Sequence, residues 1–261
     1  MLLVSPILAD GFLPLLSEPA LAGAYQLIRY HKRRWGGSTH TPPPVTIADH
    51  AGDAAALLEA LGIDRAHVAG HSSGAAVAVQ LALDHPRAAH SVMLLELSLL
   101  SLPAGKAFLE GAAPVFETYT KGAHERALAM FLKRCERPRL AVMPGAPRGA
   151  CARRRRERAR GCGHVVRSRA SGMVEWTFDA EQAASIRQPV LAVIGAETKP
   201  LWTEIAGFLR SSLTRVEDCT IDGVGHLLHI QRPESVAREL AKFLARHPIA
   251  GARPVEALQA G

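Results

Sequence analysis

The sequence Gly-His-Ser-Ser-Gly at residues 70–74 lies between a short apolar run and a run rich in alanine and leucine. The apolar run, residues 65–69, follows a turn signal and predicts a buried strand. Residues 75–83 predict a helix that ends before Pro86. A strand that enters a helix within five residues turns sharply, and flanking glycines keep side chains out of that turn. This unit favours folds in which strands and helices alternate.

The rest of the chain continues that alternation. Thr46 and Asp49 form a predicted capping box for a helix that closes at Gly62, and Pro233 opens the last predicted helix. A further helix is predicted for residues 14–22. Apolar runs predict the other strands at residues 2–5, 25–30, 91–95, 189–194 and 216–221. We therefore predict an α/β fold with a mostly parallel sheet flanked by helices.

A long insertion separates the strand predicted to end near residue 95 from the one predicted to begin near residue 189. Aromatic and alanine residues within residues 103–133 predict helices there. We predict a core made of residues 1–101 and 176–261, with residues 102–175 inserted as a helical cap. The apolar side chains of the cap serve packing or contact a substrate.

Composition narrows the classes of protein. Hydrophobic residues make up 48% of the chain and the mean hydropathy is +0.06, as in globular proteins. No apolar stretch is long enough for a membrane span, and the N-terminus lacks the basic region of a secretory signal. The four cysteines form no disulfide framework, which favours a cytoplasmic location. Oligomeric state is left open.

An arginine-rich segment at residues 134–169 carries twelve arginines and two glutamates, so the rest of the chain has a net charge of −3. Three interpretations stay open: a solvated insertion in the cap, a shifted reading frame, or an arm that binds nucleic acid or an acidic partner. Nucleic-acid binding is disfavoured because aromatic residues are not interleaved with the arginines. Zinc binding by Cys151, Cys162 and His164 is weaker still because paired Cys-x-x-Cys spacing is missing.

Ser72 is predicted to sit, exposed, at the apex of the turn and at the N-terminus of the following helix. Unpaired N–H groups and the helix dipole there favour the negative charge that develops during acyl transfer. Ser72 is therefore a candidate nucleophile. The alternative is a glycine-rich turn whose serine only caps a helix.

Four sequence segments add to this turn: Ile28-Arg29-Tyr30-His31, Gly36-Gly37-Ser38, the strand ending at Gly195 and His226-Leu227-Leu228-His229. Together with the turn, they resemble the α/β-hydrolase family, and in particular bacterial members that hydrolyse small esters, enol-lactones or carbon–carbon bonds of ring-cleavage products. The resemblance implies an α/β-hydrolase fold, here lacking the first strands of the usual fold, and a small-molecule substrate. It implies neither a cofactor nor a metal.

A serine nucleophile needs a base and an orienting acid. The resemblance assigns the base to His226, which follows a late glycine-rich turn, with a structural role or the neighbouring His229 as alternatives. The usual acid position of the family is Thr198, which carries no charge. The other acid position that the resemblance implies is the end of the strand after the serine turn and its helix, where Glu96 stands. We favour Glu96 because a carboxyl group that ends a buried strand also needs a partner, and Glu197 is the alternative. Glu96 paired with a cap arginine is the structural alternative.

The oxyanion hole is expected to combine the backbone N–H of Ser73 with that of Ile7. Ser5-Pro6 stands where family members usually have His-Gly, and proline supplies no N–H donor. We therefore predict a serine hydrolase for a small ester, lactone or related carbonyl compound. The alternative is a catalytically impaired hydrolase-like scaffold or binding protein.

Overall fold

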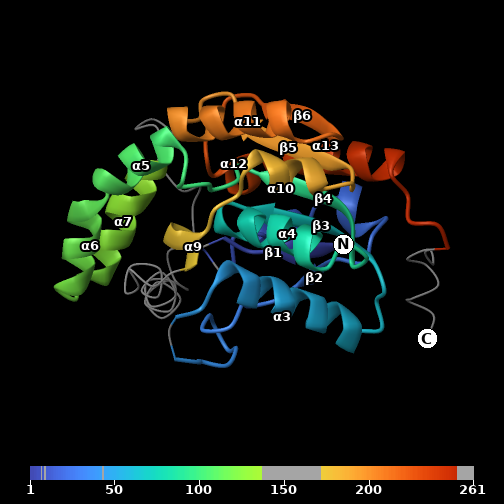
Figure 1. Ribbon diagram of the computed structural model, residues 1–261, viewed down its shortest axis with the longest axis horizontal. Coiled ribbons are helices and arrows are strands. Elements are labelled where there is room, and N and C mark those ends of the chain that lie inside the picture. Colours follow the sequence, from blue (N-terminus) through green and yellow to red (C-terminus); the bar gives the residue numbers. More distant parts are fainter. Residues whose placement is uncertain (7, 9, 43, 137–171, 252–261) are drawn as a thin grey trace.

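The computed structural model describes residues 1–6, 8, 10–42, 44–136 and 172–251. Six parallel strands form one sheet in the order β2-β1-β3-β4-β5-β6, which confirms the predicted parallel sheet (Figure 1). Because all strands run in one direction, their carboxyl ends meet at one edge, where ligands bind in open α/β sheets. The strands are β1 (Leu2–Val4), β2 (Ile28–Arg29), β3 (Ala66–His71), β4 (Ala89–Leu95), β5 (Val190–Gly195) and β6 (Val216–Ile221).

Helices cover both faces of the sheet, because side chains along each strand point alternately to opposite faces. In β4, Val92 and Leu94 belong to one apolar cluster, and Met93 and Leu95 to the other. The first cluster includes α3 (Ile47–Ala60), α4 (Ser73–Asp84), α10 (Ala180–Ser185) and α11 (Pro200–Ser212). The second includes α1 (Leu13–Leu16), α2 (Pro19–Ala22), α12 (Leu228–Gln231) and α13 (Pro233–Arg246).

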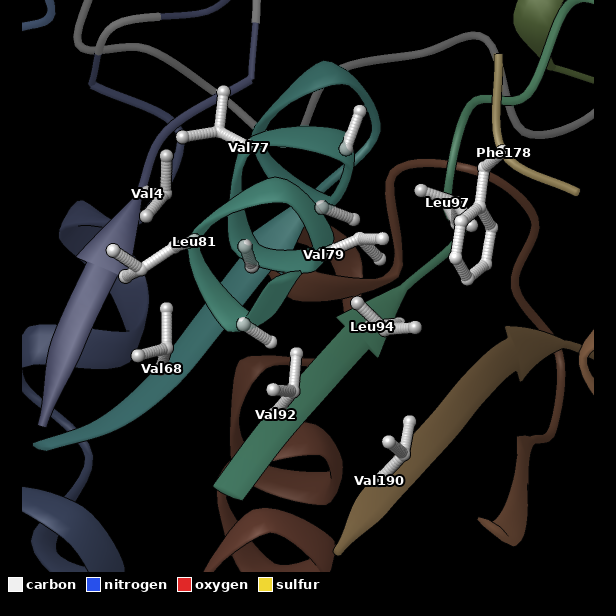
Figure 2. Packing of buried hydrophobic residues seen from close by; sticks show 14 of the residues in the cluster. Val4, Val68, Val77, Val79, Leu81, Val92, Leu94, Leu97, Phe178 and Val190 are labelled. Carbon is white, nitrogen blue, oxygen red and sulfur yellow. The ribbon is translucent and has the colours of Figure 1, made fainter. Parts of the chain in front are cut away.

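Figure 2 shows how α4 lies against the strands that carry it. Val77 and Leu81 of α4 lie on the side of Val4 and Val68 of the sheet, and Val79 lies on the opposite side of the helix. All five side chains are at most 1% exposed. Full burial of a side chain of this size stabilises the fold by about 1.5–3 kcal/mol, so this contact fixes the start of α4 relative to the strand ends.

Two elements near the N-terminus differ from prediction. The single helix expected over residues 14–22 is wrong: α1 and α2 are separate. Glu18 between them is extended, with ψ 119°, and Pro19 begins α2 because proline cannot donate the hydrogen bond needed to continue α1. The strand expected over residues 25–30 is shortened to β2, which pairs with β1 at the edge of the sheet.

The insertion contains the predicted helices α5 (Pro103–Glu110), α6 (Ala113–Thr120) and α7 (His124–Cys135), followed after a gap by α9 (Gly172–Glu175). Figure 1 shows α5, α6 and α7 in green, grouped at one end of the sheet. Most of the arginine-rich segment, with its three interpretations, lies outside the described residues. None of the described helices has both the length and the apolar character needed to cross a membrane.

Candidate active site

Ser72 occupies the predicted turn between β3 and α4 in a strained backbone conformation, with φ 55° and ψ −120°. A non-glycine residue in such a region costs on the order of 1–3 kcal/mol, so the surroundings must hold it there. A Cβ atom at Gly70 would overlap the backbone of Gly74, and one at Gly74 would overlap the backbone oxygen of Val4. Both glycines are therefore required by the close approach of α4 to the sheet.

The Ser72 side chain is buried, at 6% exposure, rather than exposed as expected. Its N–H donates to the carbonyl oxygen of Leu95 at 3.0 Å, which ties the turn to the end of β4. Its Oγ lies 3.0 Å from the Oγ of Ser98, and Ser98 N–H donates to the Ser72 carbonyl at 3.3 Å. Among the described residues, Ser98 is the hydrogen-bond partner of the Ser72 hydroxyl, and His226 is not.

His226 and Glu96 are in direct contact. The Nδ1 of His226 lies 3.0 Å from the Oε2 of Glu96, and both side chains are buried. They come from the loop after β6 and the residue after β4, separated by 130 positions in the sequence. Glu197 is half-buried, and its carboxylate makes no hydrogen bond or ion pair within the described part of the chain. Of the two predicted acids, the structure brings Glu96 to His226.

The Glu96 carboxyl group receives further hydrogen bonds. The N–H of Gly195 donates to Oε1 at 2.8 Å, and the hydroxyl of Thr198 donates to Oε2 at 2.8 Å. The backbone of Glu96 has φ 48°, a second strained position beside Ser72. Burial raises the pKa of Glu96 above its ordinary value, whereas these two hydrogen bonds lower it. Three groups thus converge on two carboxyl oxygens in a dry environment.

Burial also lowers the pKa of His226 to about 3, so its imidazole is neutral near pH 7. With Nδ1 facing Glu96, a neutral ring that donates from Nδ1 has a free lone pair on Nε2. The indole of Trp202 from α11 stacks on the ring, with centroids 4.0 Å apart. The ring is therefore restrained by packing as well as by its hydrogen bond.

Two groups that sequence reasoning missed hold the loop around His226. His71 Nε2 donates to the carbonyl oxygen of His226 at 2.7 Å, and Glu136 Oε1 accepts from the N–H of Leu227. The second oxygen of Glu136 is buried without a hydrogen-bond partner among the described residues. Burial raises the pKa of Glu136 to about 7. The position of His71 next to Ser72 in the turn motif could have indicated that it lies near the site, whereas nothing in the sequence connected Glu136 with residue 227.

The other predicted site residues have mixed outcomes. Ser73 is the first residue of α4, where N–H groups have no intrahelical acceptor. Ile7 lies outside the described residues. His229, the alternative base, is fully buried, and neither ring nitrogen has a hydrogen-bond partner within the described residues. The described residues include no group of three or more His, Cys, Asp or Glu arranged to hold a metal ion.

A cavity of about 130 Å³ opens beside these residues. Ser72, Ser73 and His226 line it together with aromatic side chains of the cap, including Phe108, Phe116 and Phe131. The lining is mainly apolar, with few polar groups converging on it, which is typical of a small-molecule site. A serine hydroxyl, a neutral imidazole and a helix N-terminus at one such cavity suit acyl transfer.

Comparisons with known proteins agree with this fold. The structure resembles an esterase from Thermogutta terrifontis (TM-score 0.72, 21% identity, 95% of this chain and 90% of that one) and a serine hydrolase from Cycloclasticus zankles (TM-score 0.74, 18% identity, 94% and 89%). A putative carbamate hydrolase RutD from Caulobacter vibrioides is 41% identical over 68 residues, which cover 26% of this chain and only a quarter of that relative. The model of the α/β hydrolase fold family matches residues 10–233. The parallel sheet, the strained serine turn and this match together establish that the chain belongs to the α/β-hydrolase family.

Proposed function

We propose that this protein is a serine hydrolase that cleaves a small ester, lactone or related carbonyl compound through Ser72, His226 and Glu96. The observation that carries the proposal is the contact of His226 Nδ1 with Glu96 at the edge of the sheet where the strained Ser72 lies. This pairing leaves Nε2 as the nitrogen that accepts a proton. The proposal is also supported by the cavity that Ser72 and His226 line together, since a substrate bound there would contact both.

The reaction proceeds in two stages, transfer of the acyl group to Ser72 and hydrolysis of the resulting ester. Ser72 Oγ attacks the substrate carbonyl carbon while its proton passes to His226 Nε2, and the backbone N–H of Ser73 donates to the oxyanion that forms. His226 then returns the proton to the leaving oxygen, which departs as an alcohol. Water attacks the resulting ester of Ser72 after giving a proton to His226, and the acid is released as Ser72 regains its proton.

Glu96 acts through His226 in both stages. A positive charge develops on the buried imidazole whenever it accepts a proton, and burial makes that charge costly. The Glu96 carboxylate at 3.0 Å offsets the cost and fixes the ring with Nδ1–H toward itself. During the reaction, the Ser72 hydroxyl exchanges its hydrogen bond with Ser98 for one with His226. Such bonds are often long or misaligned before substrate binds.

Labelling with a serine-reactive fluorophosphonate tests this proposal. We expect one adduct per chain by intact mass, none with Ser72→Ala, and undiminished labelling of the surface control Ser211→Ala. Failure to obtain a Ser72-dependent adduct overturns the enzyme proposal and favours a binding scaffold. Hydrolysis of 4-nitrophenyl esters by the same three proteins then establishes turnover.

A further inference from the structure

Lys32, in the loop after β2, is a buried cation without a counterion in the described part of the chain. The residue is 4% exposed, and its ammonium makes no hydrogen bond or ion pair with any described residue. Its Nζ lies over the ring of Trp35, 5.4 Å from the ring centroid. Burying an ammonium without a paired anion is strongly unfavourable, so its retention calls for a partner.

The cavity that contains Ser72 also contains Lys32. No aspartate or glutamate is among the described residues that line this cavity. The neighbouring Arg33 differs, because its guanidinium forms two hydrogen bonds with the carboxylate of Asp53. Arg34 also lines the cavity and is not without a partner. Of these three cations, Lys32 is the one whose ammonium has no counterion among the described residues, so its charge is left for a molecule that enters the cavity.

His50, from α3, adds a second polar group to the same lining. Its Nδ1 is buried without a hydrogen-bond partner in the described structure. Burial, with repulsion from Lys32 and Arg33, lowers the pKa of His50 to about 3, so it is a neutral ring that can donate or accept one hydrogen bond. Burial lowers the pKa of Lys32 to about 8, so the ammonium still predominates at pH 7.

We infer that Lys32 binds a carboxylate at the far end of the substrate, with His50 as a second contact, so that the compound cleaved at Ser72 is a hemiester or a lactone acid. This inference rests on the proposed function. Its chemistry follows from the lining, which combines the Ser72 hydroxyl and the His226 imidazole, the Lys32 ammonium, and apolar side chains such as Ile47 and Phe131. A short hydrocarbon chain that carries an ester and a carboxylate matches all three features.

Matched substrates test the assignment. Monomethyl glutarate, adipate and pimelate are each compared with the neutral methyl ester of the same chain length, and the ratio of the two kcat/KM values is measured. We expect the best hemiester to be favoured at least tenfold by the wild type. Lys32→Met should lower this ratio at least tenfold, Lys32→Arg should keep it within a few fold, and the surface control Lys242→Met should leave it unchanged.

A binding measurement separates this inference from the proposed function. In the Ser72→Ala background, calorimetry with the preferred hemiester should show binding that Lys32→Met weakens at least tenfold. Binding that depends on Lys32 but occurs without Ser72-dependent labelling overturns the hydrolase proposal and leaves the anion site standing. The anion site is overturned if Lys32→Met keeps the affinity for the hemiester within twofold of its value before the substitution. It is also overturned if Lys32→Met lowers kcat/KM equally for the hemiester and the neutral ester, or if Lys32→Arg weakens binding of the hemiester as much as Lys32→Met does. Thermal melts confirm that each variant is folded.

Discussion

Replacement of Glu96 by glutamine is the sharpest test of the proposed triad, because the structure predicts which way the new amide turns. The N–H of Gly195 faces Oε1 and can only donate, so the amide oxygen is held at that position. The amide NH₂ then occupies the place of Oε2 and faces His226 Nδ1. It forces Nδ1 to accept, and the ring proton moves to Nε2, where it blocks proton transfer from Ser72.

The expected loss in kcat for Glu96→Gln is about 10⁴-fold, the value for a triad whose imidazole is held in the wrong tautomer. At 1.36 kcal/mol for each factor of ten, this is about 5.5 kcal/mol of transition-state stabilisation. The substitution replaces a buried acid by a neutral group of the same shape, so we expect no loss of folding. The assay is kcat for a 4-nitrophenyl ester, with a thermal melt for each protein.

A relocated acid completes the test. The Thr198 hydroxyl lies 2.8 Å from Glu96 Oε2, so an aspartate at 198 can bring a carboxylate to the same side of His226. We expect the kcat of the double variant Glu96→Gln/Thr198→Asp to be at least tenfold higher than that of Glu96→Gln. Glu197→Gln is the matched control, and it should stay within about threefold of wild type. The reasoning is refuted if Glu96→Gln keeps more than a tenth of wild-type kcat, or if Glu197→Gln falls as far.

Three further predictions concern stability. Glu136 has a pKa raised from 4.5 to about 7 in the folded protein, so wild-type stability should fall as pH rises through this window. Measured by chemical denaturation and relative to Glu136→Gln, the fall in the free energy of unfolding is at most about 3 kcal/mol. Parallel plots of unfolding free energy against pH for the two proteins would contradict this prediction. Gly74→Ala should prevent folding or lower the free energy of unfolding by several kcal/mol, because the new Cβ overlaps Val4. Gly207→Ala in α11 has open space and should stabilise the fold by about 0.5–1 kcal/mol. Equal melting temperatures for the two variants would refute the packing argument. Leu240→Ala, in the buried face of α13, should cost about 2–5 kcal/mol in urea unfolding, and a cost below about 1 kcal/mol would mean that α13 is not packed as described.

The sequence was most informative where local chemistry decides the structure. The turn around Ser72 was predictable because sharp strand-to-helix reversals need small residues at both flanks, and the capping box at Thr46 was confirmed. Glu96 was predictable as a charged residue that ends an apolar run. The break before α2 was missed because the helical pattern was given more weight than the restriction that Pro19 imposes.

Contacts between distant segments were not predictable from one sequence. The hydrogen bond between Ser72 and Ser98 joins loops 26 residues apart, and that between Glu136 and Leu227 joins segments 91 residues apart. Each involves residue types that are common on surfaces, so composition and spacing carry no signal for them. Lys32 was equally hidden, because only the folded structure shows that its charge is buried and lacks a counterion among the residues that the structure describes.

The position of the acid shows how the two kinds of information combine. The usual acid position of the family is 198, whereas a second position known in the fold and the buried-charge argument both indicated 96. The structure brings both positions to the same imidazole, because Thr198 donates to the carboxyl group that contacts His226. Two carboxylates so close together would repel each other in a dry environment, and one of them would have to take up a proton. A neutral hydroxyl at 198 avoids that conflict and adds a hydrogen bond to Glu96. An uncharged residue at 198 is therefore what the geometry requires once Glu96, the residue after β4, supplies the charge. Thr198→Asp with Glu96 intact should raise the pKa of the pair and lower activity near neutral pH.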